Sequence, residues 1–243
     1  MKDFLQDMVA HVHTLGFLPL VKITSNNTET VMESMADDRS VILNAKTNAP
    51  VSGIDGVFGM PNLNKLDIHL KCPEYREDAK ISVVSATRNN EVVPTGLHFE
   101  NAAGDFQNDY RFMETNVIND KLKTVKFKGA KWDIEFTPAV ASIQRLKFQA
   151  AAHSEETVFQ IRTEDGNLVI SFGDASTHAG SFVFQADVTG KLRQVWAWPV
   201  TQVLSILNLD GDKTMRIADA GALQITVDSG VAVYNYILPA YTK

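Results

Sequence analysis

The apolar pattern of this chain recurs at a constant spacing of 138 positions. At this spacing Val57–Pro61 (VFGMP) is matched by Val195–Pro199 (VWAWP), and each segment leads into an apolar-periodic stretch. Leu5 likewise matches Ile143, far from either segment. Two unrelated amphipathic helices whose spacing coincides are the alternative, but a single offset that relates separated segments favours an internal repeat. The sequence therefore predicts one structural unit that is written twice.

The 243 residues are enough for two domains of ordinary size. We place the first domain at residues 1–115 and the second at residues 136–243. Residues 116–135 are predicted to form an interdomain connector, because Thr115–Lys131 breaks the periodic pattern. The lysines of this stretch are Lys121, Lys123, Lys126, Lys128 and Lys131. They contact DNA, contact a partner, or keep an exposed strand from pairing, and the sequence alone leaves these three roles open.

An amphipathic helix is predicted at the start of each half. In the first half it spans residues 2–15. Its apolar stripe consists of Leu5, Met8, Val12 and Leu15. In the second half the helix begins at Thr137-Pro138, an N-cap followed by proline, and ends near His153. A shorter helix is expected after Pro61 and again after Pro199.

Short strands are predicted between and after these helices. In the second half, residues 158–162 and 168–172 flank Thr163–Asn167, a hairpin signal with glycine near the turn. The half ends in two further strands, at residues 222–227 and 231–237. Helices mixed with antiparallel strands predict an α+β fold rather than a wound parallel sheet.

Charge and cysteine content exclude several classes of protein. The net charge is −6, whereas a general nucleic-acid binder is basic because it neutralises phosphates. Any contact with DNA therefore requires locally concentrated positive charge. The single cysteine, Cys72, excludes an intramolecular disulfide and fits a reducing compartment. No apolar run reaches the roughly 18–20 residues that span a bilayer. We expect a cytoplasmic protein, in the host cytoplasm if a phage encodes it, with no membrane contact.

Four segments share the order and spacing of motifs in one known family. Ser142–Lys147 (SIQRLK) has the pattern of that family's second-domain inner helix. Val41–Asn44 matches the strand before the second helix of the first domain, and Pro61–Leu66 with Lys71 matches that helix. Val233–Ala240 (VYNYILPA) is similar to the closing strand, with Pro and Ala transposed. On these motifs, which cover nearly the whole chain, the sequence resembles the DNA sliding clamps, especially the two-domain clamps of T4-like phages and the eukaryotic and archaeal clamps.

The resemblance implies a duplicated processivity fold (DNA clamp), in which helices line a ring inside antiparallel sheets. A two-domain chain then forms a homotrimer through head-to-tail contacts that close a ring of six domains. The ring encircles duplex DNA and contacts only phosphates, without sequence specificity. The implied partners are a replicative DNA polymerase, which gains processivity, and a clamp loader. The resemblance implies no enzymatic activity, no metal and no cofactor.

Basic residues of the helices are the candidates for DNA contact. Matching the family motifs, they are Arg145 and Lys147, then Lys71, Lys65 and Lys2. On a helical wheel Arg145 lies away from the apolar stripe, whereas Lys147 lies at its edge. Each could instead be an ordinary solvated charge. The outward face of the first helix also carries Asp3 and Asp7 instead of a basic stripe.

Partner proteins are expected to dock beside the connector and near the C-terminus. The matching apolar positions are Val41, Leu43, Leu122, Leu238, Pro239, Ala240 and Tyr241. Apolar side chains so close to a chain end are either packed in the core or exposed for binding, and the sequence leaves both open.

Motifs for catalysis are incomplete. Asp210–Asp212 lacks the rest of a calcium loop, and Ser176–His178 has no identifiable acid partner. Trp196 and Trp198 could form a binding platform, although core aromatics at a strand end are favoured. The main alternative function is a trimeric β-rich structural or receptor-binding protein, such as a virion component. A clamp requires its basic helical residues on one concave lining, whereas a structural protein does not.

Overall fold

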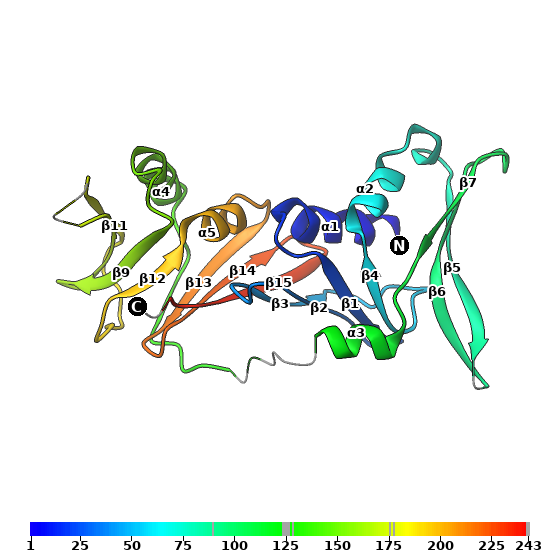
Figure 1. The fold of residues 1–243 in the computed structure, drawn as a ribbon, viewed down its shortest axis with the longest axis horizontal. Coiled ribbons are helices and arrows are strands. Elements are labelled where there is room, and N and C mark those ends of the chain that lie inside the picture. The colour runs from blue at the N-terminus through cyan, green and yellow to red at the C-terminus, as the bar shows by residue number, and fades with distance from the viewer. Residues whose placement is uncertain (89, 123–126, 128, 175, 177, 242–243) are drawn as a thin grey trace. The chain divides into compact units, whose positions relative to one another are not determined.

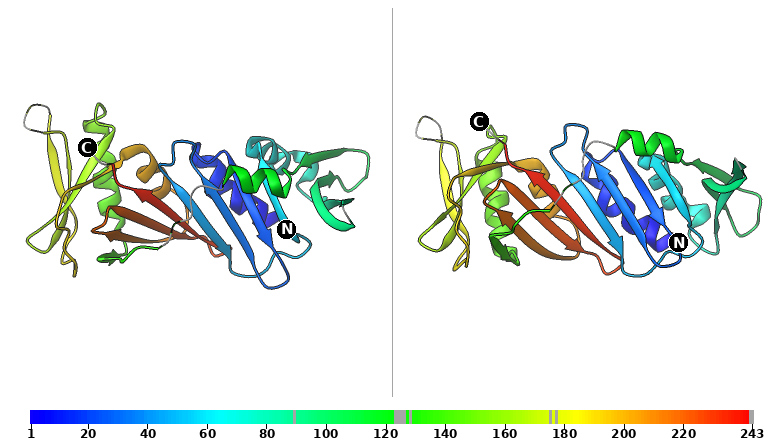
Figure 2. Two further views of the ribbon diagram at one scale, coloured as in Figure 1. Left: turned by 60° about the horizontal axis from the view of Figure 1, so that its bottom comes forward. Right: turned by 90° about the horizontal axis from the view of Figure 1, so that it is seen from below.

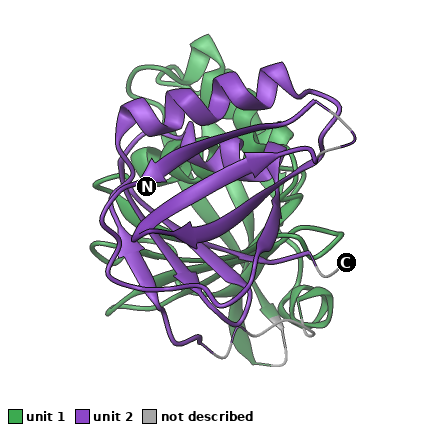
Figure 3. Cartoon of the chain, turned by 90° about the vertical axis from the view of Figure 1, so that its left-hand side faces the viewer, with its two compact units in different colours: residues 1–126, 229–234 green, residues 127–228, 235–243 purple. Residues whose placement is uncertain are grey.

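The computed structural model describes residues 1–88, 90–122, 127, 129–174, 176 and 178–241. The chain forms two compact units (Figure 3). Unit 1 comprises Met1–Lys126 with Ser229–Tyr234, and unit 2 comprises Phe127–Asp228 with Asn235–Lys243. The division after Lys126 falls inside the predicted connector, residues 116–135. The exact boundaries of the two domains, residues 1–115 and 136–243, remain a prediction.

Unit 1 contains two antiparallel sheets. The first has the strand order β4-β1-β2-β3 and the second has the order β5-β6-β7. The strands are β1 (Leu20–Ser25), β2 (Thr30–Met35), β3 (Ile42–Thr47), β4 (Gly56–Pro61), β5 (Lys80–Arg88), β6 (Glu91–Glu100) and β7 (Gln107–Arg111). The helices are α1 (Lys2–Val12), α2 (Leu63–Lys71), α3 (Thr115–Lys121) and the 3₁₀ turns η1 (His13–Leu15) and η2 (Pro73–Tyr75). Figures 1 and 2 show α1 and α2 on one face of the first sheet and α3 on the other.

Unit 2 repeats this plan. One sheet has the order β11-β10-β9-β12, and the other strands of the unit follow the order β15-β14-β13-β8. The strands are β8 (Ile134–Phe136), β9 (Val158–Glu164), β10 (Asn167–Phe172), β11 (Gly180–Gln185), β12 (Trp196–Pro199), β13 (Asp212–Ala218), β14 (Ala222–Asp228) and β15 (Ala232–Pro239). The helices are α4 (Val140–Ala152) and α5 (Val200–Leu207). Strand β15 begins in unit 1 and ends in unit 2.

The predicted duplication is confirmed at the level of elements and of strand register. The first residues of β1 and β9, Leu20 and Val158, are 138 positions apart, as are those of α1 and α4 and those of β3 and β11. Val21 pairs with Met60 in unit 1, and Phe159 pairs with Trp198 in unit 2 at the same offset. The outer edges of β4 and β12 are each met by one isolated bridge, Gly59 to Met113 and Ala197 to Tyr241.

The apolar stripes predicted from the sequence build the cores. Leu5, Met8 and Val12 of α1 are fully buried, and Leu146 of α4 is too. Burial of each such side chain contributes about 1.5–3 kcal/mol, so the stripe fixes which face of the helix meets the sheet. Trp198 is also fully buried, and its indole N–H donates to the carbonyl of Leu238 at 3.0 Å. The core interpretation of this tryptophan is therefore confirmed.

One local prediction, the start of helix α4, is wrong. Helix α4 starts at Val140, with Ala139 as its N-cap, and not at Thr137-Pro138. Ala139 is extended (φ −69°, ψ 144°), and its carbonyl accepts hydrogen bonds from the amides of Ser142 and Ile143, so the helix begins after it. The stretch Thr115–Lys131, which includes most of the predicted connector, also contains a helix that the sequence did not predict, α3. Lys123, Lys126 and Lys128 of that stretch lie outside the described residues.

No helix in the described part of the chain combines the length and the apolar character that crossing a membrane demands.

Candidate nucleic-acid interface

Each unit presents the outer side of two helices, and these two surfaces hold the candidate DNA contacts. The helix face of unit 1 consists of the exposed residues Asp3, Gln6, Ala10, Asn64, Lys65, Ile68 and Lys71. The helix face of unit 2 consists of Val140, Ala141, Gln144, Arg145, Phe148, Ala151, Ala152 and Thr201. The buried stripes described above turn these residues outward, so both surfaces follow directly from helical periodicity.

On unit 1 the three predicted lysines differ in how their charge is engaged. The ammonium of Lys2 donates to the carbonyls of Tyr75 and Arg76 at 2.7 and 2.8 Å, which ties α1 to η2. Lys71 pairs with Asp67 one turn earlier on α2 at 2.7 Å. Lys65 is exposed, and none of the described carboxylates forms an ion pair with it. Of the three lysines, Lys65 is therefore the one whose ammonium is most accessible to a phosphate.

His69 on α2 adds no positive charge at neutral pH. Partial burial lowers its pKa below the usual 6.5, and the nearby ammonium of Lys65 lowers it further. Its ring lies against Phe99, with 5.2 Å between ring centroids. The imidazole therefore remains a neutral packing group above its lowered pKa.

On unit 2 both predicted residues lie on α4. Arg145 is exposed and Lys147 is half-buried, as expected for a lysine at the edge of the apolar stripe. Phe148, on the same helix, is 71% exposed. Helix α5 (VTQVLSIL) carries no charged side chain. The helix face of unit 2 is thus positive at one place and apolar or neutral elsewhere.

The predicted partner-docking residues divide into buried and accessible ones. Val41, Leu43 and Leu238 are fully buried, so their side chains serve the core and present nothing to a partner in this structure. Leu122 and Ala240 are half-buried, whereas Pro239 and Tyr241 are exposed. These last positions are held by backbone bonds, from Ala240 N–H to Gly221 and from Tyr241 N–H to Ala197.

The sequence did not reveal a difference between the sheet edges of the two units. In unit 1 the segment Ser229–Tyr234 runs beside β3, and the backbone and side-chain amides of Asn48 each donate at 2.9 Å, to Val231 and Gly230 respectively. Strand β11 is the counterpart of β3, but within the described residues no strand covers its outer side. Val183 on β11 is 40% exposed. The 138-residue offset, extended from β3 to β11, is the signal that could have revealed this open edge.

Side chains for metal chemistry do not gather in the described structure: no group of three or more His, Cys, Asp or Glu residues there could hold an ion. Thr177 of the Ser176–His178 motif lies outside the described residues. Trp196, unlike Trp198, is half-buried.

Solved structures of similar fold were found, although no protein-family model and no curated protein matches the sequence. A structure of PCNA from Thermococcus kodakaraensis aligns with TM-score 0.68 and 12% identity over 99% of this chain and 97% of that one. A structure of A. fulgidus PCNA bound to the C-terminal region of FEN-1 aligns with TM-score 0.66 and 11% identity over 100% and 95%. Proliferating Cellular Nuclear Antigen from Entamoeba histolytica aligns with TM-score 0.64 and 9% identity over 99% and 94%. With near-complete coverage in both directions, the chain has the duplicated α+β fold of the PCNA-type DNA sliding clamps.

Proposed function

We propose that this chain is the subunit of a homotrimeric sliding clamp that encircles duplex DNA and tethers a replicative DNA polymerase, conferring processivity. It acts as a scaffold and not as an enzyme, works without a cofactor, and operates in the cytoplasm. The observation that carries the proposal is the pair of duplicated units in which, among the described residues, the outer edge of β11 is not covered by a strand. The fold shared with PCNA over the whole chain supports the same conclusion.

The open edge of β11 supports a head-to-tail ring. In unit 1 the equivalent edge, on β3, is accompanied by the segment that starts β15, and β15 follows β13 and β14. By the internal repeat, the strand that should cover β11 is the one that follows β5 and β6, which is β7. Strand β7 is also the last strand of its sheet. If β7 of one copy pairs with β11 of the next, the contact is heterologous and repeats around a closed ring.

Contacts with DNA are proposed to run through phosphates. Lys65, Lys71 and Arg145 are exposed on their helices, and Lys147 is half-buried at the edge of the apolar stripe of α4. Contacts with phosphates carry no sequence information. Each contact is weak, because the helix faces carry few cations and because acidic residues such as Asp3 lie on the same faces. Retention on DNA would then rest on the closed ring and not on affinity.

Partner tails are proposed to dock at Pro239–Tyr241 and Leu122, the accessible members of the predicted set. One solved clamp carries the C-terminal region of FEN-1, which shows that a clamp of this fold can bind a partner's tail. The polymerase and the clamp loader are the partners proposed for this chain. The predicted domains, residues 1–115 and 136–243 with the connector 116–135, are retained in this proposal.

Assembly tests the ring. Light scattering should give a mass near three times 26.8 kDa at micromolar concentration. Val183→Lys places on β11 a charge that would lose water in the contact, so the mass should fall toward that of one chain. Val195→Lys, at another half-exposed valine of unit 2, is the matched control and should leave the trimer intact. A wild-type protein that stays monomeric at high concentration would refute the ring.

A further inference from the structure

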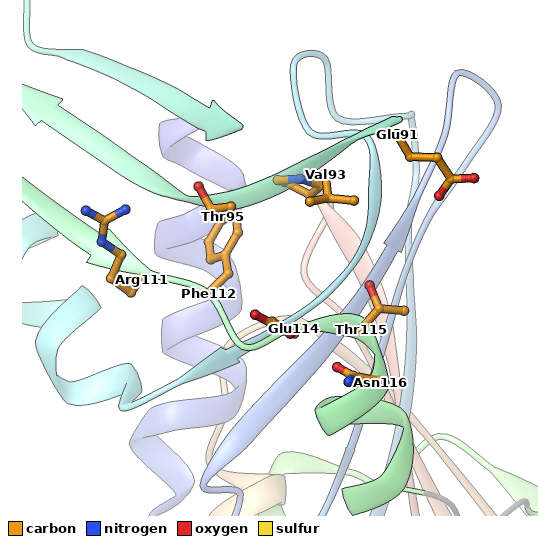
Figure 4. A pocket seen from close by; sticks show the side chains of 9 residues that line it. Glu91, Val93, Thr95, Arg111, Phe112, Glu114, Thr115 and Asn116 are labelled. Atoms are coloured by element: carbon orange, nitrogen blue, oxygen red, sulfur yellow. The ribbon is translucent and has the colours of Figure 1, made fainter. Parts of the chain in front are cut away.

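Unit 1 contains a cavity of about 550 Å³ where two segments of the chain separate (Figure 4). Strand β6 pairs with β5 along its whole length, but it pairs with β7 only over Gly96–Glu100. After the amide of Phe112 has donated to Thr95, the chain leaves β6, and Met113 pairs with Gly59 of β4 instead. Glu91–Pro94 therefore has a partner strand on one side only, within the described structure.

The cavity has a firm apolar floor. Phe112 stacks on the buried Phe58 with 4.1 Å between ring centroids and an interplanar angle of 11°. Val93 and Pro94 line the wall formed by β6. Beside them Val92 is 75% exposed, an unusual place for a large apolar side chain on an open strand edge. A preformed floor lowers the ordering cost of binding, and a volume of this size suits a few residues of an extended segment.

The charges around the cavity favour a basic occupant. The carboxylate of Glu91, on β6, lines the cavity and is exposed (Figure 4). Glu114, before α3, also lines the cavity but already has an interaction within the chain. The single cation in the lining, Arg111, already lies 3.6 Å from the carboxylate of Asp109. The protein as a whole carries a charge of −6, which adds to the attraction.

We propose that this cavity, the β6 edge cavity, binds an extended segment of a partner protein in which an apolar side chain is flanked by lysine or arginine. The segment adds as a strand beside Glu91–Pro94, so that backbone hydrogen bonds supply affinity. Its apolar side chain rests on Phe112 and a flanking cation faces Glu91. The site lies wholly within unit 1 and is separate from the docking proposed at Pro239–Tyr241, so it does not depend on the ring or on DNA.

Two synthetic peptides test the site on the full-length protein: acetyl-Lys-Val-Phe-Val-Lys-amide and its counterpart with both lysines replaced by glutamate. The basic peptide should slow amide hydrogen exchange at Glu91–Val93, and the acidic peptide should not. Glu91→Lys should weaken binding of the basic peptide about tenfold, whereas Glu155→Lys, the same charge change at an exposed carboxylate of unit 2, should leave it unchanged.

Three results would overturn the proposal. Exchange at Glu91–Val93 that the basic peptide does not change would show that the edge does not accept a strand. Equal weakening by the two variants would show that only net charge matters. Protection that rises with protein concentration in the absence of peptide would assign the cavity to a second copy of this chain.

Discussion

The side chain of Asp7 is 11% exposed and connects α1 to the segment Ser229–Tyr234. Its carboxylate accepts hydrogen bonds from Tyr234 at 2.7 Å and Ser229 at 3.0 Å, and His11 lies at 3.3 Å. Burial alone would raise the pKa of Asp7, but the hydrogen bonds and charge of these partners outweigh it and lower the pKa below 3.8. His11 also stacks on Tyr234, with 4.6 Å between centroids. One carboxylate thus holds three other side chains of unit 1 in place.

The pH dependence of the free energy of unfolding should reveal the contribution of the Asp7 carboxylate. Because the folded-state pKa is lowered, its contribution is complete above the unfolded value near 3.8 and is lost as pH falls through the folded value. Asp7→Asn should cost about 1.5–3 kcal/mol at pH 7 and flatten the loss of stability below pH 4. Urea unfolding across pH measures both effects. Asp3→Asn, on the exposed side of α1, should alter neither.

Arg145 and Lys147 are the residues proposed to contact DNA in unit 2. Arg145→Glu with Lys147→Glu should shorten the products of processive synthesis on primed circular DNA with the cognate polymerase and loader, because phosphates would then face carboxylates. The pair Lys191→Glu with Arg193→Glu makes the same charge change outside the helices and should have no effect. Circular dichroism checks folding. Unchanged product length in the first pair would remove these residues from the interface.

At the scale of elements, the sequence predicted the two main helices and the strand repeat, but it missed helix α3 and the burial of the β3 region. Leu5, Met8 and Val12 could be placed because their spacing fits only one helix face. The run Val41-Ile42-Leu43 gives no such information, because three consecutive apolar residues place apolar side chains on both faces of a strand. The sequence therefore does not show which face is buried. Ile118 is fully buried only because β4 lies beneath it. Such burial depends on tertiary contacts that local periodicity does not contain.

The contact between α3 and β4 can be used to test whether the burial of Ile118 depends on this tertiary packing. A methyl group added at Gly59 would come within 3.0 Å of three carbons of Ile118, so Gly59→Ala should destabilise by about 1–3 kcal/mol. Ile118→Ala should cost about 2–5 kcal/mol through the cavity that it leaves. The double variant should cost less than the sum, because the added methyl fills part of that cavity. Additive losses in chemical denaturation would show that the two residues do not share this space.

At the scale of the whole molecule, retention on DNA should depend on topology more than on charge. Once loaded on a nicked circular duplex, the protein should remain bound through gel filtration at about 0.2 M salt, where screening weakens contacts between exposed charges and phosphates. Linearising the circle should release it, since a ring slides off an open end. Loss from both substrates at the same rate would indicate ordinary surface binding. The patchy charge of the two helix faces makes this distinction clearer than in a strongly basic protein.

The membership of Ser229–Tyr234 in unit 1 has a consequence for the making of the protein. A ribosome completes Met1–Lys126 early, but all of Phe127–Asp228 must be synthesised before the segment that lies beside β3 exists. At about 5–20 residues per second, that interval lasts roughly 5–20 s for a stretch of about 100 residues. Throughout it the nascent chain carries an unfinished first unit with β3 uncovered, which is a surface prone to pairing with other chains. The rate of translation of the second half therefore determines how long unit 1 remains incomplete.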